Sequence, residues 1–303
     1  MSEVQSARLL DGLIAARLLD QDGGEVSFRH DWLRASLNGK LPPPARRQRM
    51  VLGLTGNIAM GKSTVLSMLA KLGAQVIDAD RLVHRLREPG APGYAPLIEA
   101  LGRDVLLPDG RVDTAALSRK AFQDPVMLAR LEHIFRPLVV AEIGQMLQRS
   151  VHAVVVIEAI KLLEGDLRKQ VDQVWVVDAS REQQIRRLMA DRGYSREQAV
   201  ARIEAQNPQA DKLAQADVVI RNEGDLAATW RQVLDAWDGV LERLAQAGEL
   251  PAALVETFVR VSLEQAELPD LPEVVTADLR RLAQAIGSKG RGIAREQAAA
   301  FFQ

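Results

Sequence analysis

A glycine-flanked segment that ends in lysine, serine and threonine carries the strongest chemical pattern in the chain. It follows the apolar run Val51–Leu54 and has the spacing G-x-x-x-x-G-K-[ST]. Glycine at both ends permits a tight path, so the loop amides can face an anion at the start of a helix. In this pattern the lysine reaches the β- and γ-phosphates of a nucleotide, and the serine hydroxyl ligates Mg²⁺. The alternative is a glycine turn between an ordinary strand and helix. The predicted phosphate loop consists of Gly56, Asn57, Ile58, Ala59, Met60, Gly61, Lys62, Ser63 and Thr64.

Carboxylates close two further apolar runs. Asp78 and Asp80 follow Val76 and Ile77, and their spacing of two places both side chains on one face of an extended chain. Glu158 ends the run Val154–Ile157. Ligands of open parallel sheets bind at the carboxyl ends of strands. A carboxylate beside the phosphate loop can accept a proton from a substrate hydroxyl or hold Mg²⁺ through water. Helix capping by the aspartates, and a plain strand end at Glu158, are the alternatives.

An arginine-rich stretch, residues 181–208, has the pattern of a helical lid. A kinase must stabilise the charge of the transferring group and exclude water, and a mobile lid with arginines does both. We expect Arg187 to contact phosphate, whereas Arg192 and Arg202 suit either a phosphate or a solvated helix face. Surface positions are expected for Arg181 and Arg196.

Two other polar residues are weaker candidates. His84 lies one helical turn after Asp80, where it can contact a substrate phosphate or lie on the helix surface. Asn222 follows the last apolar run, where its amide can bind adenine or form a turn.

The composition excludes several classes of protein. Lys and Arg total 39 against 40 Asp and Glu, so nothing favours non-specific binding to nucleic acid or membranes. The chain has no cysteine, which excludes disulfides and thiolate metal sites and fits a cytoplasmic protein. The four histidines are scattered without metal-ligand spacing, and no apolar run approaches the length of a membrane span.

Apolar runs alternate with helical patterns from Met50 onward, which predicts an α/β fold with a parallel sheet covered on both faces. The five predicted strands are Val51–Leu54, Ala74–Ile77, Ala153–Ile157, Gln173–Val177 and Asp217–Ile220. A helical insertion is expected at about residues 83–150, and helix Asp225–Leu244 closes the domain, which spans residues 50–245.

The two ends of the chain stand apart from this domain. Residues 1–45 are expected to form a helical appendage, Ala7–Leu19 and His30–Leu37 with a possible strand at Glu25–Phe28, and a proline-rich linker. A winged-helix-like fragment is the alternative. Residues 246–303 form a second predicted helical extension, with helices Ala252–Gln265, Ala277–Ile286 and Ile293–Phe302.

The ordered motifs resemble the dephospho-coenzyme A kinase family from about Val51 to Gly239. The loop LTGNIAMGKST is similar to the family's LTGGIGSGKST, and VIDAD at Val76–Asp80 matches its strand-end motif. EPGAPGY, the Asp109-Gly110 turn and AFQDP follow the family's insertion, which holds coenzyme A. Arg202–Gln206 resembles the lid pattern RIxxQ, and Ala216–Gly224 resembles the ending ADxVIxNxG.

The resemblance implies a P-loop three-layer α/β/α sandwich that uses ATP and Mg²⁺ to phosphorylate the 3′-hydroxyl of dephospho-coenzyme A. It implies that Asp80 is the catalytic base, and we expect Lys62 and Arg187 to stabilise the transferring phosphoryl group. The expected cofactor contacts outside the loop are Arg192 and Asn222, the metal contacts are Ser63 and Glu158, and the acceptor contacts are Asp78, His84, Arg136 and Arg202.

Five positions depart from the family pattern. Ala59 replaces a glycine and Met60 a small serine in the loop, which leaves its key glycines, lysine and serine in place. Arg136 stands where the family has histidine, and arginine can still pair with phosphate. Lys161 replaces an apolar residue, and Thr114 replaces a common arginine. The last three bear on how the acceptor is held.

Two other functions fit the same sequence. A nucleoside or nucleotide kinase with another acceptor shares the chemistry of the phosphate loop. An ATP-dependent regulatory switch would give the terminal extensions a role in recruiting a partner, and they can also mediate self-association.

Overall fold

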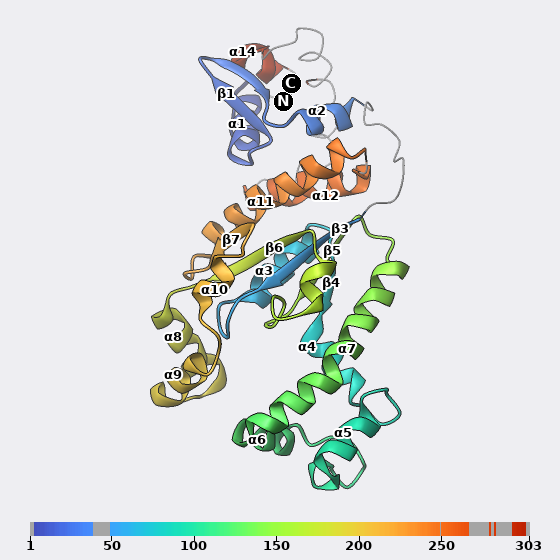
Figure 1. The fold of residues 1–303 in the computed structure, drawn as a ribbon. Helices are drawn as coiled ribbons and strands as arrows, with labels where there is room; N and C mark the ends of the chain where they lie inside the picture. The colour runs from blue at the N-terminus through green and yellow to red at the C-terminus, as the bar shows by residue number, and fades with distance from the viewer. Residues whose placement is uncertain are drawn as a thin grey trace.

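Five parallel strands form the centre of the computed structural model, which describes residues 3–38, 49–248, 250–266, 279, 282 and 293–300. Their order is β4-β5-β3-β6-β7, and every pairing between neighbours is parallel. The carboxyl ends of all five therefore lie at one edge of the sheet (Figure 1). The strands are β3 (Met50–Thr55), β4 (Gln75–Asp78), β5 (Val154–Glu158), β6 (Gln173–Asp178) and β7 (Val218–Arg221). The predicted five-stranded parallel sheet is confirmed.

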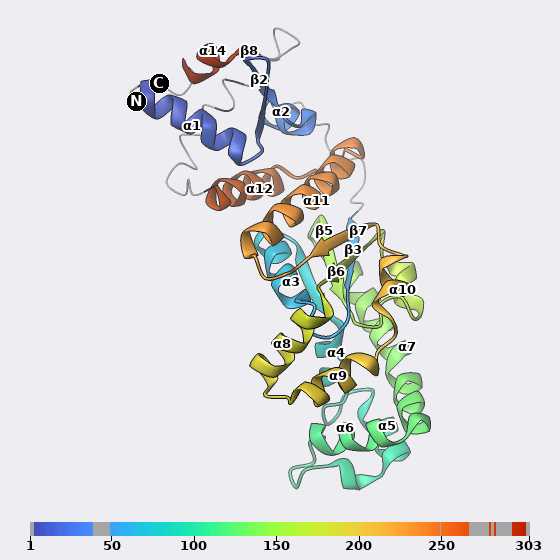
Figure 2. The same ribbon diagram turned by 90° about the vertical axis from the view of Figure 1, so that its left-hand side faces the viewer.

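Helices cover both faces of this sheet (Figure 2). On one face, α3 (Lys62–Lys71) and α11 (Leu226–Gln246) share a core with Leu52 of β3. On the other face, α4 (Ala79–Leu86) and α7 (Pro125–Arg149) share a second core with Ile157 of β5. Because successive side chains of a strand point to opposite faces, the buried strands β3 and β5 contribute to both cores. The three-layer α/β/α sandwich is confirmed.

Two helical segments extend beyond the carboxyl edge of the sheet, on opposite sides of it (Figure 1). The insertion comprises α5 (Tyr94–Leu101), a 3₁₀ turn at Arg103–Val105, α6 (Thr114–Gln123) and the long α7, which contacts α4, α5 and α6. The lid comprises α8 (Arg181–Arg192) and α9 (Arg196–Glu204), and α10 (Gln209–Leu213) leads back to β7. A further 3₁₀ turn, Asp166–Gln170, precedes β6.

The two ends of the chain meet in a small terminal unit. Its sheet has the order β1-β2-β8, and Val26 of β2 is paired with Ile293 of β8 in an antiparallel ladder. Helix α1 lies against α14. The members of the terminal unit are α1 (Glu3–Ala15), β1 (Leu19–Asp22), β2 (Glu25–Phe28), α2 (Asp31–Leu37), β8 (Ile293–Ala294) and α14 (Arg295–Ala300).

This terminal unit differs from the two helical extensions that we predicted. A β-hairpin at Leu19–Phe28 lies within the N-terminal appendage. The first two residues of the predicted helix Ile293–Phe302 form the short strand β8. The strand expected at Glu25–Phe28 is present as β2, whereas β1 and β8 were not predicted because such short strands carry little periodicity. Helix Ala252–Gln265 is present as α12. The predicted linker at residues 40–47 lies outside the described residues, and so does most of the predicted helix Ala277–Ile286.

The terminal unit packs on α11 and α12, away from the carboxyl edge of the sheet (Figure 2). Trp32 of α2 donates a hydrogen bond to Asp238 of α11 over 3.1 Å and meets Phe258 of α12 edge to face. His30 lies 3.1 Å from the other oxygen of Asp238. The described helices include none that is long and apolar enough to cross a membrane.

Candidate active site

The phosphate loop joins β3 to α3, as its strand and helix flanks predicted, and its backbone requires glycine at two positions. Gly56 has φ 147°, and a Cβ there would lie 2.5 Å from the carbonyl oxygen of Val177. Gly61 has φ 91°, and a Cβ there would lie 1.9 Å from Nδ2 of Asn222. Both the left-handed conformation and the close approach of other groups exclude a side chain. The loop thus lies directly against β6 and the segment after β7.

A side chain of the lid helix α8 binds the carbonyl groups of the phosphate loop. Arg187 donates to the carbonyl oxygens of Ala59 at 3.0 Å, Met60 at 3.1 Å and Asn222 at 2.7 Å. Asn222, which is buried, donates from Nδ2 to the carbonyl of Met60 at 3.1 Å. Both side chains therefore brace the loop in this structure.

Two amides of the loop bind side chains from the segment after the lid. The amide of Ile58 donates to Oε1 of Gln206 over 2.7 Å, and that of Asn57 donates to Oε1 of Gln209 over 3.1 Å. Neither contact was predicted from the sequence. A glutamine side chain is uncharged, and neither glutamine has a spacing in the sequence that marks it as a partner of the loop. The only hint was that Gln206 ends the RIxxQ pattern.

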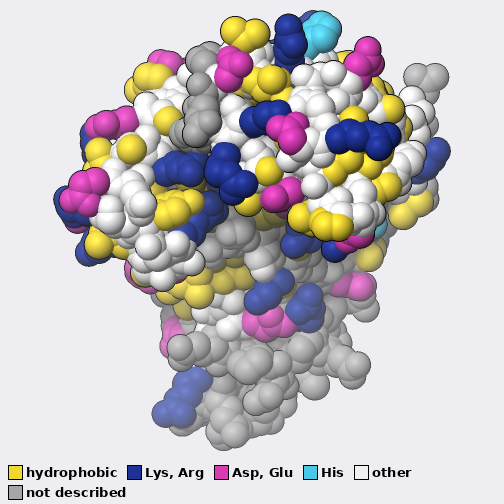
Figure 3. Space-filling model, turned by 90° about the horizontal axis from the view of Figure 1, so that it is seen from below, with side chains coloured by type: hydrophobic (Ala, Val, Ile, Leu, Met, Phe, Trp, Pro, Cys, Tyr) yellow, Lys and Arg dark blue, Asp and Glu magenta, His cyan; other side chains and the backbone are white. Residues whose placement is uncertain are grey.

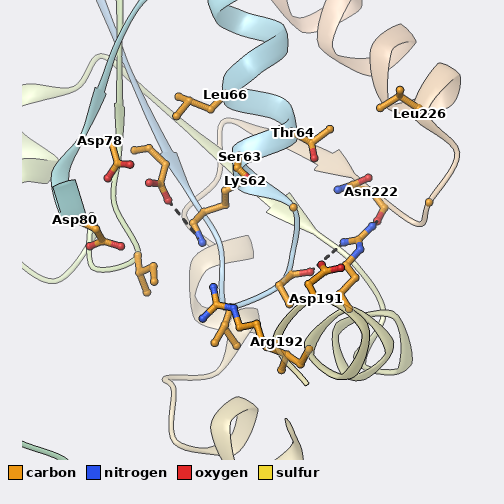
Figure 4. Close-up of a pocket in the computed structure, with 18 residues that line it drawn as sticks. Lys62, Ser63, Thr64, Leu66, Asp78, Asp80, Asp191, Arg192, Asn222 and Leu226 are labelled. Carbon is orange, nitrogen blue, oxygen red and sulfur yellow. Dashed lines mark hydrogen bonds and ion pairs between the residues drawn. The ribbon is translucent and has the colours of Figure 1, made fainter. Parts of the chain in front are cut away.

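A cavity of about 500 Å³ lies at the carboxyl edge of the sheet, between the phosphate loop, the two aspartates after β4 and the lid (Figure 4). Figure 4 shows Asp80 and Lys62 facing the same space from different elements. Leu226 at the start of α11 and Thr64 lie at the opposite end of the cavity. The predicted site residues that line it are Ile58, Ala59, Gly61, Lys62, Ser63, Thr64, Asp78, Asp80, Glu158, Arg187, Arg192 and Asn222.

Lys62 is the centre of the charges in this cavity. Its Nζ lies 3.6 Å from Oε1 of Glu158 and 3.4 Å from the carbonyl oxygen of Asn57, and only 11% of its side chain is exposed. Burial lowers the pKa of Lys62, although the carboxylates of Glu158 and Asp80 oppose that change. The carboxylates of Asp78, Asp80, Glu158 and Asp191 thus share the cavity with the cations Lys62, Arg187 and Arg192.

The three carboxylates have different surroundings. Asp78 caps α4, because its Oδ1 accepts from the amide of Arg81 at 2.9 Å, so the expectation of a capping role also holds. Desolvation by the surrounding protein, and then the charge of Asp78, raise the pKa of Asp80. Burial raises the pKa of Glu158 to about 7, and Lys62 opposes the change. Asp80 thus differs from Asp78 in having no hydrogen bond within the part of the chain that the structure describes.

The raised pKa of Glu158 predicts a fall in stability with pH. Between its ordinary value of 4.5 and about 7, the folded protein keeps a proton that the unfolded chain has lost. The free energy of unfolding must therefore decrease as the pH rises through this window. We expect Glu158→Gln to remove this dependence, so that the variant gains about 2 kcal/mol relative to wild type between pH 5 and pH 8. Urea unfolding of both proteins at pH 5 and pH 8 measures this difference in the free energy of unfolding. The same pH dependence in both proteins would contradict a raised pKa of Glu158.

Ala59 holds a conformation that suits the glycine of the family pattern. Its φ is 58°, in the left-handed region, which costs an L-residue roughly 1–2 kcal/mol. Met60 is buried, and its Sδ lies 3.1 Å from the amide of Ala179, so this side chain anchors the loop in the core. The main chain of Met60 still contributes to the loop, but its side chain does not reach the cavity.

Replacing Ala59 by glycine should relieve the unfavourable φ. We expect Ala59→Gly to raise the free energy of unfolding by about 0.5–1 kcal/mol, since part of the gain is offset by the entropy of the unfolded chain. Ala70→Gly is a matched control in the exposed surface of helix α3, where the same change should cost about 1 kcal/mol. Equal losses in both variants would show that Ala59 is unstrained. Chemical denaturation measures both changes.

Arg192 is a second lid arginine that faces the cavity. It lines the cavity and makes no hydrogen bond or ion pair with any described residue. Figure 4 shows it reaching from α8 toward the phosphate loop. Arg187 uses three of its N–H donors in hydrogen bonds to the loop and to Asn222. The donors of Arg192 remain available to a ligand.

Three predicted acceptor contacts lie outside this cavity. His84 is one turn along α4 from Asp80, in contact with Arg87. Arg136 pairs with Glu132 at 3.3 Å, and the same carboxylate also pairs with Lys161. Arg202 lies over the ring of Tyr194 at 5.8 Å, within the lid. Seen from the side of the insertion and lid, Lys and Arg side chains flank the hollow between these two segments (Figure 3).

Comparisons with known proteins identify the family of this chain. A family model described as dephospho-CoA kinase matches residues 50–228. The dephospho-CoA kinase of Symbiobacterium thermophilum is 44% identical over 190 residues, which cover 62% of this chain and 80% of that protein. That of Carboxydothermus hydrogenoformans is 40% identical over 187 residues, covering 61% and 91%. The crystal structure of TT1252 from Thermus thermophilus is 34% identical, with a TM-score of 0.57, over 64% of this chain and 98% of that one. The chain therefore belongs to the dephospho-CoA kinase family.

Proposed function

We propose that this kinase transfers the γ-phosphoryl group of ATP to the 3′-hydroxyl of dephospho-CoA, giving coenzyme A. The observation that carries the proposal is that Asp80, Lys62 and Ser63 line one cavity at the end of the phosphate loop. Membership of the family supports the acceptor, since the relatives named above are dephospho-CoA kinases.

Asp80 is proposed as the base that takes the proton of the 3′-hydroxyl. A general base works best when its pKa approaches the working pH, and the surroundings of Asp80 raise its pKa from the ordinary 3.8. The proton moves from the hydroxyl to a carboxylate oxygen as the hydroxyl oxygen bonds to phosphorus, and the bond between the γ-phosphorus and the bridging oxygen of ADP breaks. Asp78 caps the helix that carries Asp80 and so supports its position.

Phosphate charge is assigned to three cations of the cavity. Lys62 and Arg192 line the cavity. Lys62 would contact the β- and γ-phosphates, and Arg192 would stabilise the transferring group. Arg187 acts mainly by positioning the loop, although two of its five N–H donors remain for a phosphate. Asn222 shares this bracing role, and the first loop amides would contact phosphate once Gln206 and Gln209 are displaced.

Mg²⁺ fits the donors of the cavity. It prefers oxygen ligands and usually takes only one or two carboxylates, with water and substrate phosphates completing the shell. Ser63 and Glu158 would hold it, and Glu158 is a buried carboxylate whose charge Lys62 only partly offsets. Among the described residues no group of three acidic or histidine side chains suits a metal on its own. When bound, Mg²⁺ would neutralise charge on the phosphates.

The acceptor is assigned to the side of the cavity that faces the insertion. Asp78, His84, Arg136 and Arg202 remain the proposed acceptor contacts. The charge of Arg136 is already compensated by Glu132, so its contribution to binding an anion should be the smallest of the cationic contacts.

A phosphoryl-transfer assay tests the function directly. The full chain with ATP, Mg²⁺ and dephospho-CoA should give a product phosphorylated at the 3′-hydroxyl, mapped by ³¹P NMR and fragmentation in a mass spectrometer. The 3′-deoxy analogue of dephospho-CoA is the matched control and should give no product. Preference for a nucleoside acceptor would overturn the proposal, and so would slow ATP hydrolysis that no acceptor stimulates.

A further inference from the structure

Helix α4 carries three residues of different chemistry on one side. Asp80, His84 and Arg87 are spaced i, i+4 and i+7, so they lie on one face of the helix and of its C-terminal cap. At a rise of 1.5 Å per residue, this face extends roughly 10 Å from Asp80 toward the insertion. The buried residues of α4, which are Ala79, Leu82 and Leu86, belong to another face.

Arg87 is a buried cation without an acidic partner. It is 9% exposed, and within the described residues no carboxylate lies within 4 Å of its guanidinium. Nη2 donates to Oγ1 of Thr114 over 3.0 Å and contacts Nδ1 of His84. The other guanidinium nitrogens, Nε and Nη1, make no hydrogen bond with another described residue.

Burying a charge without a counter-charge is energetically unfavourable, so a buried arginine of this kind suggests a site for an anionic ligand. Burial lowers the pKa of Arg87, but a guanidinium stays charged in proteins. Arg136 of the insertion and Lys161 after β5 differ in this respect, because Glu132 pairs with both. Arg87 is thus a cation that is held in place by neutral groups and can offer its charge to an anion.

His84 lies against the guanidinium of Arg87. Burial and the charge of Arg87 lower the pKa of His84, which favours the neutral form of its ring. Nη2 of Arg87 contacts Nδ1 of this ring and lies 3.4 Å from Nε2, so the ring helps to orient the guanidinium. Asp80 and Asp78 are the acidic groups that act on this ring, and both favour its protonated form.

We infer that Arg87, oriented by Thr114 and assisted by His84, binds the pyrophosphate of the acceptor. The inference rests on the proposed function, because it takes dephospho-CoA as the acceptor. The ribose that offers its 3′-hydroxyl to Asp80 carries the pyrophosphate on its 5′ carbon, so the two groups must be bound at separate points. The face of α4 provides one residue for each group. Asp80 at one end would accept the proton of the hydroxyl, and the N–H donors of Arg87 at the other end would bind the pyrophosphate.

Replacement of Arg87 tests this assignment by its effect on one substrate alone. We expect Arg87→Gln to raise the KM for dephospho-CoA roughly tenfold to a hundredfold, with kcat within threefold and the KM for ATP unchanged. Arg87→Lys keeps the charge but lacks the fork, so it should give a smaller rise. Arg130→Gln, at an exposed position of α7, is the matched control and should change neither KM.

A truncated ligand separates pyrophosphate binding from a general disturbance. Adenosine has the ribose but no phosphate, so its inhibition constant against dephospho-CoA should be the same in wild type and Arg87→Gln. An equal loss for adenosine and dephospho-CoA would overturn the inference, and so would a variant with unchanged KM. Thermal unfolding and ATP affinity check that the variant is folded.

Direct binding distinguishes failure of this inference from failure of the proposed function. Calorimetry of dephospho-CoA with the full chain, without ATP, should show weaker binding to Arg87→Gln than to wild type. If wild type binds the compound in this way but does not phosphorylate it, the reaction is wrong while the anion site stands. If wild type turns it over and Arg87→Gln binds it equally well, the site is wrong while the function stands. If wild type neither binds nor phosphorylates it, both fail.

Discussion

Asp80→Asn is expected to lower kcat by about 10²- to 10⁴-fold while the affinity for ATP stays within threefold of wild type. Asparagine has nearly the same shape as aspartate, but its amide cannot accept the proton of the 3′-hydroxyl. Asp80 lines the cavity without a structural hydrogen bond among the described residues, so the substitution should leave the fold intact. Steady-state turnover of dephospho-CoA and equilibrium binding of ATP measure the two quantities.

The pH profile distinguishes a base from a merely structural group. If Asp80 is the base, kcat/KM of the wild type rises with pH through the raised pKa of Asp80, and the variant loses this limb. Asp78→Asn is an instructive comparison, because asparagine also caps helices well and should preserve the bond from Arg81. Turnover of Asp80→Asn within tenfold of wild type would refute the assignment, and a far larger loss in Asp78→Asn would transfer it to that residue.

The central sheet could be predicted from the sequence because local pattern and tertiary environment agree there. Strands β3 and β5 are buried on both faces, so they appear as continuous apolar runs rather than alternating ones. The phosphate loop was equally clear, because Gly56 and Gly61 meet steric demands that no other residue satisfies. Asp78 and Asp80 reached the cavity because a parallel sheet brings the ends of its strands together.

The remaining features depend on contacts between distant segments. Val26 of the expected strand Glu25–Phe28 pairs with Ile293 in a ladder too short to show a period, so the pairing of the two chain ends could not be foreseen. Arg187 was expected to contact phosphate from its place in an arginine-rich stretch, but no local pattern reveals that it donates to carbonyls of the loop. Arg87 escaped notice for the same reason, since burial without an acidic partner is visible only in three dimensions.

The bracing of the loop links the lid to nucleotide binding. Arg187 and Gln184 of α8 hold the carbonyls of the loop, while Gln206 and Gln209 after the lid occupy its amides. A phosphate that contacted these two amides would replace the glutamine oxygens, while the hydrogen bonds to the loop carbonyls could persist.

Lys62→Met is expected to lower kcat/KM for ATP by on the order of 10³-fold or more. The lysine is 11% exposed and faces Glu158 at 3.6 Å, so its removal takes away the cation for the β- and γ-phosphates and also leaves buried carboxylates uncompensated. Methionine keeps the length and the apolar packing of the side chain without the charge. Lys71→Met, in the last turn of the same helix, is the matched control. It loses only a cation–π contact with Trp230 and should keep wild-type kinetics.

A second readout tests whether the effect arises from charge rather than from a disturbed loop. Lys62 lowers the pKa of Glu158, which burial raises to about 7, so the pKa of Glu158 should rise further in Lys62→Met. The pH-dependent fall in the free energy of unfolding should then extend to higher pH in the variant than in wild type. Urea unfolding across pH 5–9 measures this shift. An unchanged dependence, or a loss of kcat/KM below tenfold, would show that Lys62 does not have the central position in the cavity that its contacts indicate.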